Sequence, residues 1–139
     1  MDANACSAGE GAAVQRQTFC VAICTRNRMK LLEDCLSSVL REVVETGGAH
    51  SIVVVENDTQ PRSERVIAKQ KLKFPSVDIA YHLEPELGIA TARNRSLSLA
   101  LSSGADWIAF IDDDEVMQRG WLSAMLRGAS MMDAEVLTG

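Results

Sequence analysis

The residues best suited to chemistry are three consecutive aspartates, Asp112, Asp113 and Asp114, which are followed by Glu115. They come directly after the apolar run Trp107–Ile111, which has the character of a buried strand. Like charges this close together repel one another unless a cation neutralises them. Carboxylate oxygens suit Mg²⁺ and Mn²⁺, and Mg²⁺ usually takes one or two carboxylates together with phosphate oxygens of a substrate. The cluster therefore predicts a Mg²⁺ or Mn²⁺ site.

The spacing within the cluster indicates which carboxylates share a ligand. In an extended segment, side chains two residues apart lie on the same face, so Asp112 and Asp114 can serve one metal ion and the diphosphate bound to it. A solvated turn that caps the next helix is the simpler interpretation of any single aspartate, because aspartate is a favoured helix cap. Four acids directly after a buried strand favour the metal site over a cap.

The elements that must position this cluster follow from the hydrophobic pattern, in which short apolar runs alternate with helical periodicity. We expect strands at 19–24, 52–55, 77–83, 107–111 and 136–138, and helices at 31–44, 61–73, 89–101 and 121–129. Alternation with fully apolar strands predicts an α/β fold, a Rossmann-like and mainly parallel sheet with helices on both faces. Residues 1–17 are small and polar and show no period, so we expect a flexible leader followed by one domain at 18–139.

Polar residues also follow the other predicted strands. Thr25 and Asn27 follow the first strand, Glu56 follows the second, and Arg93 lies one turn into the helix after the third. In open α/β sheets the ligand lies beyond the carboxyl ends of the strands, so we expect these groups and the aspartates to rim one crevice. Taken singly, each has a structural interpretation, as a helix cap for Thr25 and Asn27 and as a solvated charge for the other two.

Composition excludes several classes of function. The 139 residues are 47% apolar and 24% charged, which is typical of a folded domain, and the net charge of −5 argues against nucleic-acid binding. No apolar stretch reaches the ~18–20 residues that cross a bilayer, and the N-terminus lacks the pattern of a secretion signal. The four cysteines form no C-x-x-C pair, so we expect buried thiols at Cys20, Cys24 and Cys35 and a cytoplasmic protein.

Taken in order, the motifs resemble the nucleotide-binding half of family-two glycosyltransferases of the GT-A fold. The matching segments are Val21–Arg28, Ile52–Asp58, Gly88–Asn94, Phe110–Glu115 and Gly120–Leu122. Their combination is most similar to bacterial exopolysaccharide glucosyltransferases of the succinoglycan type. The resemblance implies metal-dependent transfer of a sugar, with inversion, from a nucleotide-diphosphosugar to a glycan or lipid-linked acceptor in polysaccharide synthesis, with a UDP-sugar as the favoured donor.

The resemblance also implies a role for individual residues. It places the nucleotide-sugar at Thr25, Asn27, Glu56, Arg93, Asp112 and Asp113, and a Mg²⁺ or Mn²⁺ ion at Asp112 and Asp114. Asp113 is expected to face the sugar or the ribose, and Glu56 to bind the nucleoside. A peripheral association with the cytoplasmic face of the membrane is left open.

The chain departs from the family pattern in two ways. The first loop of the family often reads Pro-Thr-Tyr-Asn, whereas Cys24 and Arg26 stand here in place of the proline and tyrosine. Family members also continue well past the fifth strand, so we expect the catalytic base beyond Gly139 and a fold that is incomplete at its C-terminus. One alternative is therefore a truncated, inactive nucleotide-binding fragment. A less favoured alternative is a haloacid-dehalogenase-like phosphatase, with Asp112 as nucleophile and Asp114 as acid/base.

Overall fold

The computed structural model describes residues 17–132, 135, 136 and 138. Within these residues, strands and helices alternate strictly along the chain. The elements are β1 (Phe19–Thr25), α1 (Met29–Thr46), β2 (Ser51–Glu56), α2 (Glu64–Lys73), β3 (Asp78–Leu83), α3 (Ile89–Ser102), β4 (Trp107–Asp112) and α4 (Trp121–Met131). This alternation confirms the predicted α/β class.

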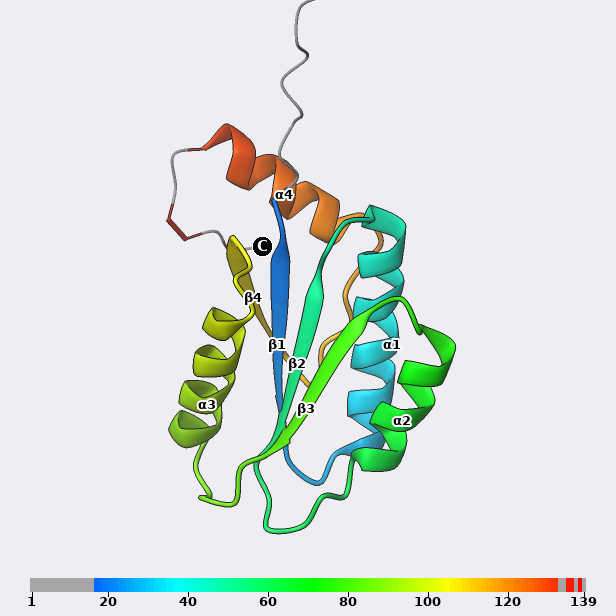
Figure 1. Ribbon diagram of the computed structural model, residues 1–139, viewed down its shortest axis with the longest axis vertical. Helices are drawn as coiled ribbons and strands as arrows, with labels where there is room; N and C mark the ends of the chain where they lie inside the picture. The colour runs from blue at the N-terminus through cyan, green and yellow to red at the C-terminus, as the bar shows by residue number, and fades with distance from the viewer. Residues whose placement is uncertain (1–16, 133–134, 137, 139) are drawn as a thin grey trace, which may run out of the picture.

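The strands form one parallel sheet in the order β3-β2-β1-β4 (Figure 1). The chain moves outward from β1 through β2 to β3 and then returns to the other side of β1 to form β4. This reversal creates a topological switch point between β1 and β4, the place where open α/β sheets bind ligands. The register pairs Thr25 with Glu56 and Cys24 with Asp112, so the carboxyl ends of β1, β2 and β4 lie at one edge.

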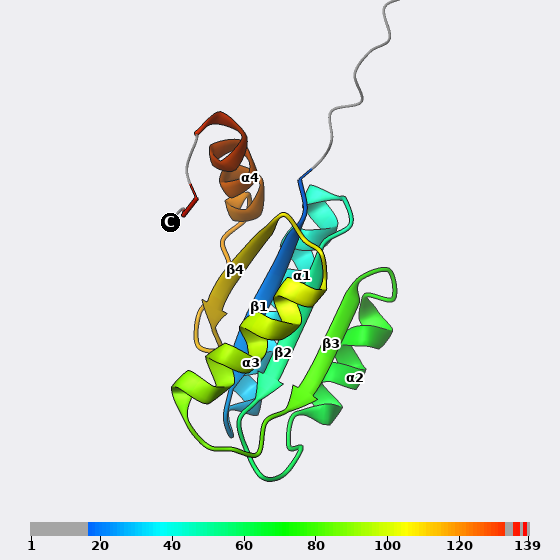
Figure 2. The same cartoon turned by 60° about the vertical axis from the view of Figure 1, so that its left-hand side comes forward.

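Helices cover both faces of the sheet, as predicted. Helices α1 and α2 lie on one face and α3 lies on the other (Figures 1 and 2). Because side chains alternate along a strand, Val21 and Ile23 of β1 pack with Leu36 and other α1 residues in the larger core. Cys20 and Val53 point the other way and pack with α3. The sheet is therefore the rigid middle layer that sets the position of every strand end.

The cysteines are placed largely as predicted. Cys20 and Cys35 are completely buried, whereas Cys24, the residue before the last of β1, is only partly buried. All three are free thiols.

Helix α4 lies at the far end of the molecule from the strand carboxyl ends (Figure 1). Among the described residues, no helix has the length and apolar character needed to cross a bilayer.

Two sequence predictions need correction. Helix α2 begins at Glu64 and not at residue 61, because Ser63 turns its N–H and hydroxyl toward Glu56 and the preceding residues form a turn. No strand follows β4 among the residues that the structure describes. Val136 and Thr138 belong to no strand, since neither makes the ladder hydrogen bonds that define one, and residue 137 lies outside the described residues. The predicted leader at 1–17 likewise lies outside them, apart from Gln17.

Candidate functional site

A crevice of about 490 Å³ opens at the carboxyl ends of the strands, beside the switch point. Its walls include Thr25 at the end of β1 with Arg26 and Arg28 of the following loop. They also include Arg93 of α3 and the acidic turn Asp112–Asp114, which begins at the last residue of β4. The loop after β1 and the acidic turn therefore rim one crevice, which confirms the predicted convergence of these two segments. The crevice brings three arginines and three aspartates together, so it can bind both a cation and an anion.

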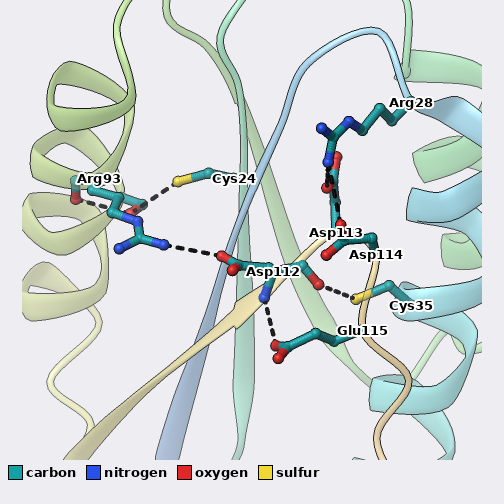
Figure 3. Close-up of polar contacts among 9 residues, drawn as sticks. Cys24, Arg28, Cys35, Arg93, Asp112, Asp113, Asp114 and Glu115 are labelled. Atoms are coloured by element: carbon teal, nitrogen blue, oxygen red, sulfur yellow. Dashed lines mark hydrogen bonds and ion pairs between the residues drawn. The ribbon is translucent and has the colours of Figure 1, made fainter.

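Two of the three aspartates present their carboxylates to solvent. The side chains of Asp112 and Asp114 are 62% and 53% exposed. Arg93 Nη2 donates to Asp112 Oδ1 at 3.1 Å, and Arg28 Nη1 donates to Asp114 Oδ2 at 3.5 Å (Figure 3). Both ion pairs are exposed, and exposed pairs contribute little stability, so a competing ligand can displace either arginine at low cost.

Asp113 behaves differently from its neighbours. Its side chain is only 6% exposed, and its two oxygens accept hydrogen bonds from Thr25 Oγ1 at 2.7 Å and from Arg28 Nη1 at 3.2 Å. These two hydrogen bonds link the end of β1 and the loop after it to the acidic turn. The expected contact of Asp113 with a sugar or ribose stays a prediction.

The exposed carboxylates fit a divalent cation that keeps part of its shell for other ligands. The described residues contain no group of three or more His, Cys, Asp or Glu side chains that could hold a metal by themselves. Asp112 ends β4 and Asp114 lies in the turn that follows, so the expectation that they share one face of an extended segment is wrong. Both residues nevertheless line the crevice and offer hard oxygen atoms. Mg²⁺ and Mn²⁺ sites of this kind use one or two carboxylates and complete their shell with phosphate oxygens and water. The donor set therefore suits a metal bound together with a phosphorylated ligand.

The acidic turn is closed by its own hydrogen bonds. Glu115 Oε2 accepts from the N–H of Asp112 at 2.9 Å, and the Glu115 N–H donates to the Asp112 carbonyl at 3.1 Å. The same carbonyl accepts from Cys35 Sγ at 3.4 Å. Burial, reinforced by the negative charges of the acidic turn, raises the pKa of Cys35 to about 12, so the thiol stays protonated and can donate. Glu115 therefore shapes the turn, a role that the sequence analysis did not assign.

Asn57 organises the other wall of the crevice and was missed as a site residue. It is 5% exposed, and its Nδ2 donates to the carbonyls of Glu84 and Glu86 at 3.0 and 2.7 Å. Its Oδ1 accepts from the N–H of Gly88 at 2.9 Å, directly before α3. Gly88 has a φ of 155°, and a Cβ there would lie 3.3 Å from Thr91 Oγ1. The Glu-Asn-Asp cluster after β2 was the available signal, but only the fold shows which member faces the crevice.

Glu56 does not line the crevice, unlike the three aspartates at the end of β4. It is completely buried, and its carboxylate accepts from the Ser63 N–H at 2.9 Å, from Ser63 Oγ at 3.0 Å and from the Tyr81 hydroxyl. Burial and the neighbouring Glu56 carboxylate raise the pKa of Tyr81, which keeps the phenol protonated as a donor. Glu56 thus joins β2, β3 and α2, and its expected contact with a nucleoside stays a prediction.

Asn27 also lies outside the lining of the crevice. Its φ is 52°, a left-handed conformation that asparagine tolerates better than most residues with a side chain. This conformation turns the chain between β1 and α1 and so carries Arg28 toward the acidic turn. The expected role of Asn27 toward a nucleotide is not tested by this geometry.

Comparison with protein families gives a match over nearly the whole described chain. The model described as "Glycosyl transferase family 2" matches residues 20–138. The succinoglycan biosynthesis protein ExoM of Rhizobium meliloti (strain 1021) is 30% identical over 119 residues. That alignment covers 86% of this chain and 37% of ExoM, so the chain spans little more than a third of the length of this relative.

Solved structures share the fold at low sequence identity. The mannosyltransferase PcManGT from Pyrobaculum calidifontis, in complex with GDP-Man and Mn²⁺, has a TM-score of 0.69 and 17% identity over 88% of this chain and 34% of its own. TarS 1-349 of S. aureus in complex with UDP has a TM-score of 0.57 and 18% identity, over 82% of this chain and 32% of its own. These likenesses establish the GT-A type of fold.

Proposed function

The chain belongs to glycosyl transferase family 2, and on that premise we propose that it supplies the donor-binding site for transfer of a sugar from a nucleotide-diphosphosugar. The observation that carries the proposal is the crevice in which the exposed carboxylates of Asp112 and Asp114 lie against Arg93 and Arg28. A diphosphate with a bound cation presents the complementary charges, anionic oxygens for the arginines and a cation for the aspartates. The family match favours this transferase over the phosphatase alternative.

The arginines and aspartates would exchange partners when the donor binds. Arg28 and Arg93 would leave the carboxylates for phosphate oxygens, and the freed Asp112 and Asp114 would hold Mg²⁺ or Mn²⁺. The metal would neutralise charge on the departing nucleoside diphosphate, as a Lewis acid does. The N-terminus of α3, which has no acidic residue in its first turn, adds backbone N–H groups that favour an anion. Thr25 and Asp113 would hold the two walls at a constant separation.

The acceptor and the identity of the donor belong to the same proposal. Similarity to ExoM, a succinoglycan biosynthesis protein, supports a role in exopolysaccharide synthesis. We propose a glycan or lipid-linked acceptor and transfer with inversion. Structures of the shared fold contain UDP in TarS and GDP-Man with Mn²⁺ in PcManGT, so a nucleoside diphosphate and a divalent metal are supported as ligands. We propose UDP as the nucleotide. The cytoplasmic location, including its membrane face, stays a prediction.

Thermal unfolding of the purified chain tests this function. We expect Mn²⁺ together with UDP to raise Tm by several degrees, because a ligand at ~100 times its Kd stabilises the folded state by about 2.7 kcal/mol. Mn²⁺ alone and UDP alone should each raise Tm less, since the metal binds only the aspartates and the diphosphate binds only the arginines. GDP in place of UDP measures the base preference. Equal Tm values with and without both ligands would refute the proposal.

A further inference from the structure

Helix α1 carries a row of three polar residues on its buried face, namely Cys35, Ser38 and Glu42. Spacings of three and four residues put these side chains on the same side of the helix. Their exposures are 0%, 2% and 1%, so none of them interacts with solvent. Buried polar groups are costly unless they are hydrogen-bonded, so the partners of this row show what it does.

Ser38 Oγ donates to the carbonyl of Cys35 at 2.7 Å within α1. Every other hydrogen-bond partner of this row is a main-chain group on or beside the connection from β4 to α4. Cys35 Sγ donates to the carbonyl of Asp112 at 3.4 Å, at the start of the acidic turn. Ser38 Oγ accepts from the N–H of Met117 at 2.9 Å. Glu42 accepts from the N–H groups of Gly120 at 3.0 Å and Leu122 at 3.3 Å, at the end of the connection. In Figure 1 the connection runs beside α1.

The row meets a specific need of the connection. Residues 113–120 form neither helix nor strand, so their backbone groups depend on partners outside regular structure. A buried carboxylate such as Glu42 is favourable at the N-terminus of α4, where unpaired N–H groups and the helix dipole attract negative charge. Met117 is itself 3% exposed, and its N–H would be left unpaired if the hydroxyl of Ser38 were absent.

We propose that Ser38 and Glu42 are positioning residues for the donor site, which hold the connection so that the acidic turn presents Asp112 and Asp114 to the crevice. Neither side chain is among those that line the crevice. Their effect on ligand binding would pass through the backbone that they fix. The proposal rests on the proposed function for its ligand readout alone.

The neighbouring Ser37 offers a matched control. Its hydroxyl donates to the carbonyl of Glu33 at 2.6 Å and accepts from Gln70 Nε2 of α2 at 2.8 Å, away from the connection. Ser37→Ala and Ser38→Ala remove the same atom from adjacent residues of one helix, and each leaves one buried donor without its partner. Any difference between the two variants in hydrogen exchange or ligand binding is therefore due to the group that each hydroxyl binds and not to a general weakening of α1.

Amide hydrogen exchange without any ligand is the first test. We expect Ser38→Ala to speed exchange of the Met117 amide and its neighbours in 113–120 by about tenfold. The reason is that loss of the hydrogen bond to a buried N–H raises the equilibrium constant for local opening by about a factor of ten. Ser37→Ala should leave exchange of this segment as in the wild type. Equal exchange in the two variants would overturn the proposal, whether or not the chain binds nucleotide.

Binding of Mn²⁺ with UDP is the second test. We expect Ser38→Ala to weaken this binding three- to tenfold, and Ser37→Ala, at a similar loss of Tm, to change it less than twofold. Glu42→Gln keeps one acceptor and should give an intermediate loss, whereas Glu42→Ala should resemble or exceed Ser38→Ala. Equal affinities in both serine variants would overturn the proposal. If the wild type binds no ligand, the proposed function fails and the exchange experiment still decides the positioning role.

Discussion

The carboxyl ends of β2 and β4 both bring acidic side chains to the same edge of the sheet, yet the two ends differ in what surrounds them. Glu56 at the end of β2 is completely buried, and three protein donors from Ser63 and Tyr81 surround its carboxylate. Asp112 and Asp114 at and after the end of β4 are more than half exposed, and each has one exposed arginine as its partner.

The difference shows how burial decides the task of an acid. A buried carboxylate with all of its donors in place stabilises the fold, and removing it leaves those donors unpaired. An exposed carboxylate in a weak ion pair contributes little to the fold and is free to change partner. We therefore expect substitutions at the end of β4 to change the affinity for ligand, and substitutions at the end of β2 to change the stability of the fold.

The largest effect is expected from Asp112→Asn on ligand binding. The variant should bind Mn²⁺ with UDP about 100-fold more weakly, because the metal loses one of only two protein carboxylates. Its free energy of unfolding should change by less than about 0.5 kcal/mol, since the side chain is exposed. Calorimetric titration and urea unfolding measure the two quantities. Asp78→Asn, at the opposite edge of the sheet, is the control and should leave the affinity unchanged.

Glu56→Ala should show the reverse behaviour. We expect the free energy of unfolding to fall by about 2–4 kcal/mol, because buried donors of Ser63 and Tyr81 lose their acceptor. Urea unfolding measures this loss, with the exposed Glu86→Ala as a control for the change in charge. A loss of affinity without a loss of stability would show that Glu56 acts on a ligand, and the contrast between the two strand ends would fail.

Arg28→Gln should separate the two proposed functions of the arginines that pair with Asp112 and Asp114, which are to bind carboxylate and to bind phosphate. With the ion pair to Asp114 removed, Mn²⁺ alone should bind about two- to fivefold more tightly, which corresponds to the usual strength of an exposed pair. UDP should bind more weakly in the presence of Mn²⁺, because a phosphate partner is gone. Arg65→Gln on the exposed face of α2 should do neither. Weaker binding of Mn²⁺ alone would contradict the proposed exchange of partners.

The smallest effect is expected for the pH dependence of stability, through His50 beside the first residue of β1. His50 Nδ1 accepts from the N–H of Phe19 at 3.1 Å, and Nε2 lies 3.0 Å from the carbonyl of Gly47. Burial lowers the pKa of His50 below its ordinary value of about 6.5. The unfolded chain therefore takes up a proton first, and stability is lost as the pH falls below about 6.5.

Unfolding by urea between pH 7.5 and about 5 measures this dependence. In His50→Gln the slope of stability against pH in this interval should become smaller. An unchanged slope would assign the loss to other groups.

Much of the architecture was predictable from the order of residue types. The apolar runs at 19–24 and 52–55 are strands with nearly the predicted bounds, because a run without polar residues is accommodated where both faces are covered. The run at 107–111 is also a strand, but it lies at the edge of the sheet and its Phe110 is 49% exposed. Helix boundaries were less accurate at α2, where the bond between Ser63 and Glu56 moved the first helical residue. A contact between residues seven positions apart across a turn leaves no mark in hydrophobic periodicity.

Strand–helix alternation was enough to predict that acids, arginines and small polar residues gather at the carboxyl edge of a parallel sheet, since it fixes the direction of the strands. Which acid is buried and which is exposed could be known only from the packing of the folded chain. Asp113 and Glu56 are buried and accept hydrogen bonds from Thr25 and Tyr81, which lie on other elements. Asp112 and Asp114 remain exposed to solvent. Burial depends on what packs against a side chain, and that is set by residues distant in the chain.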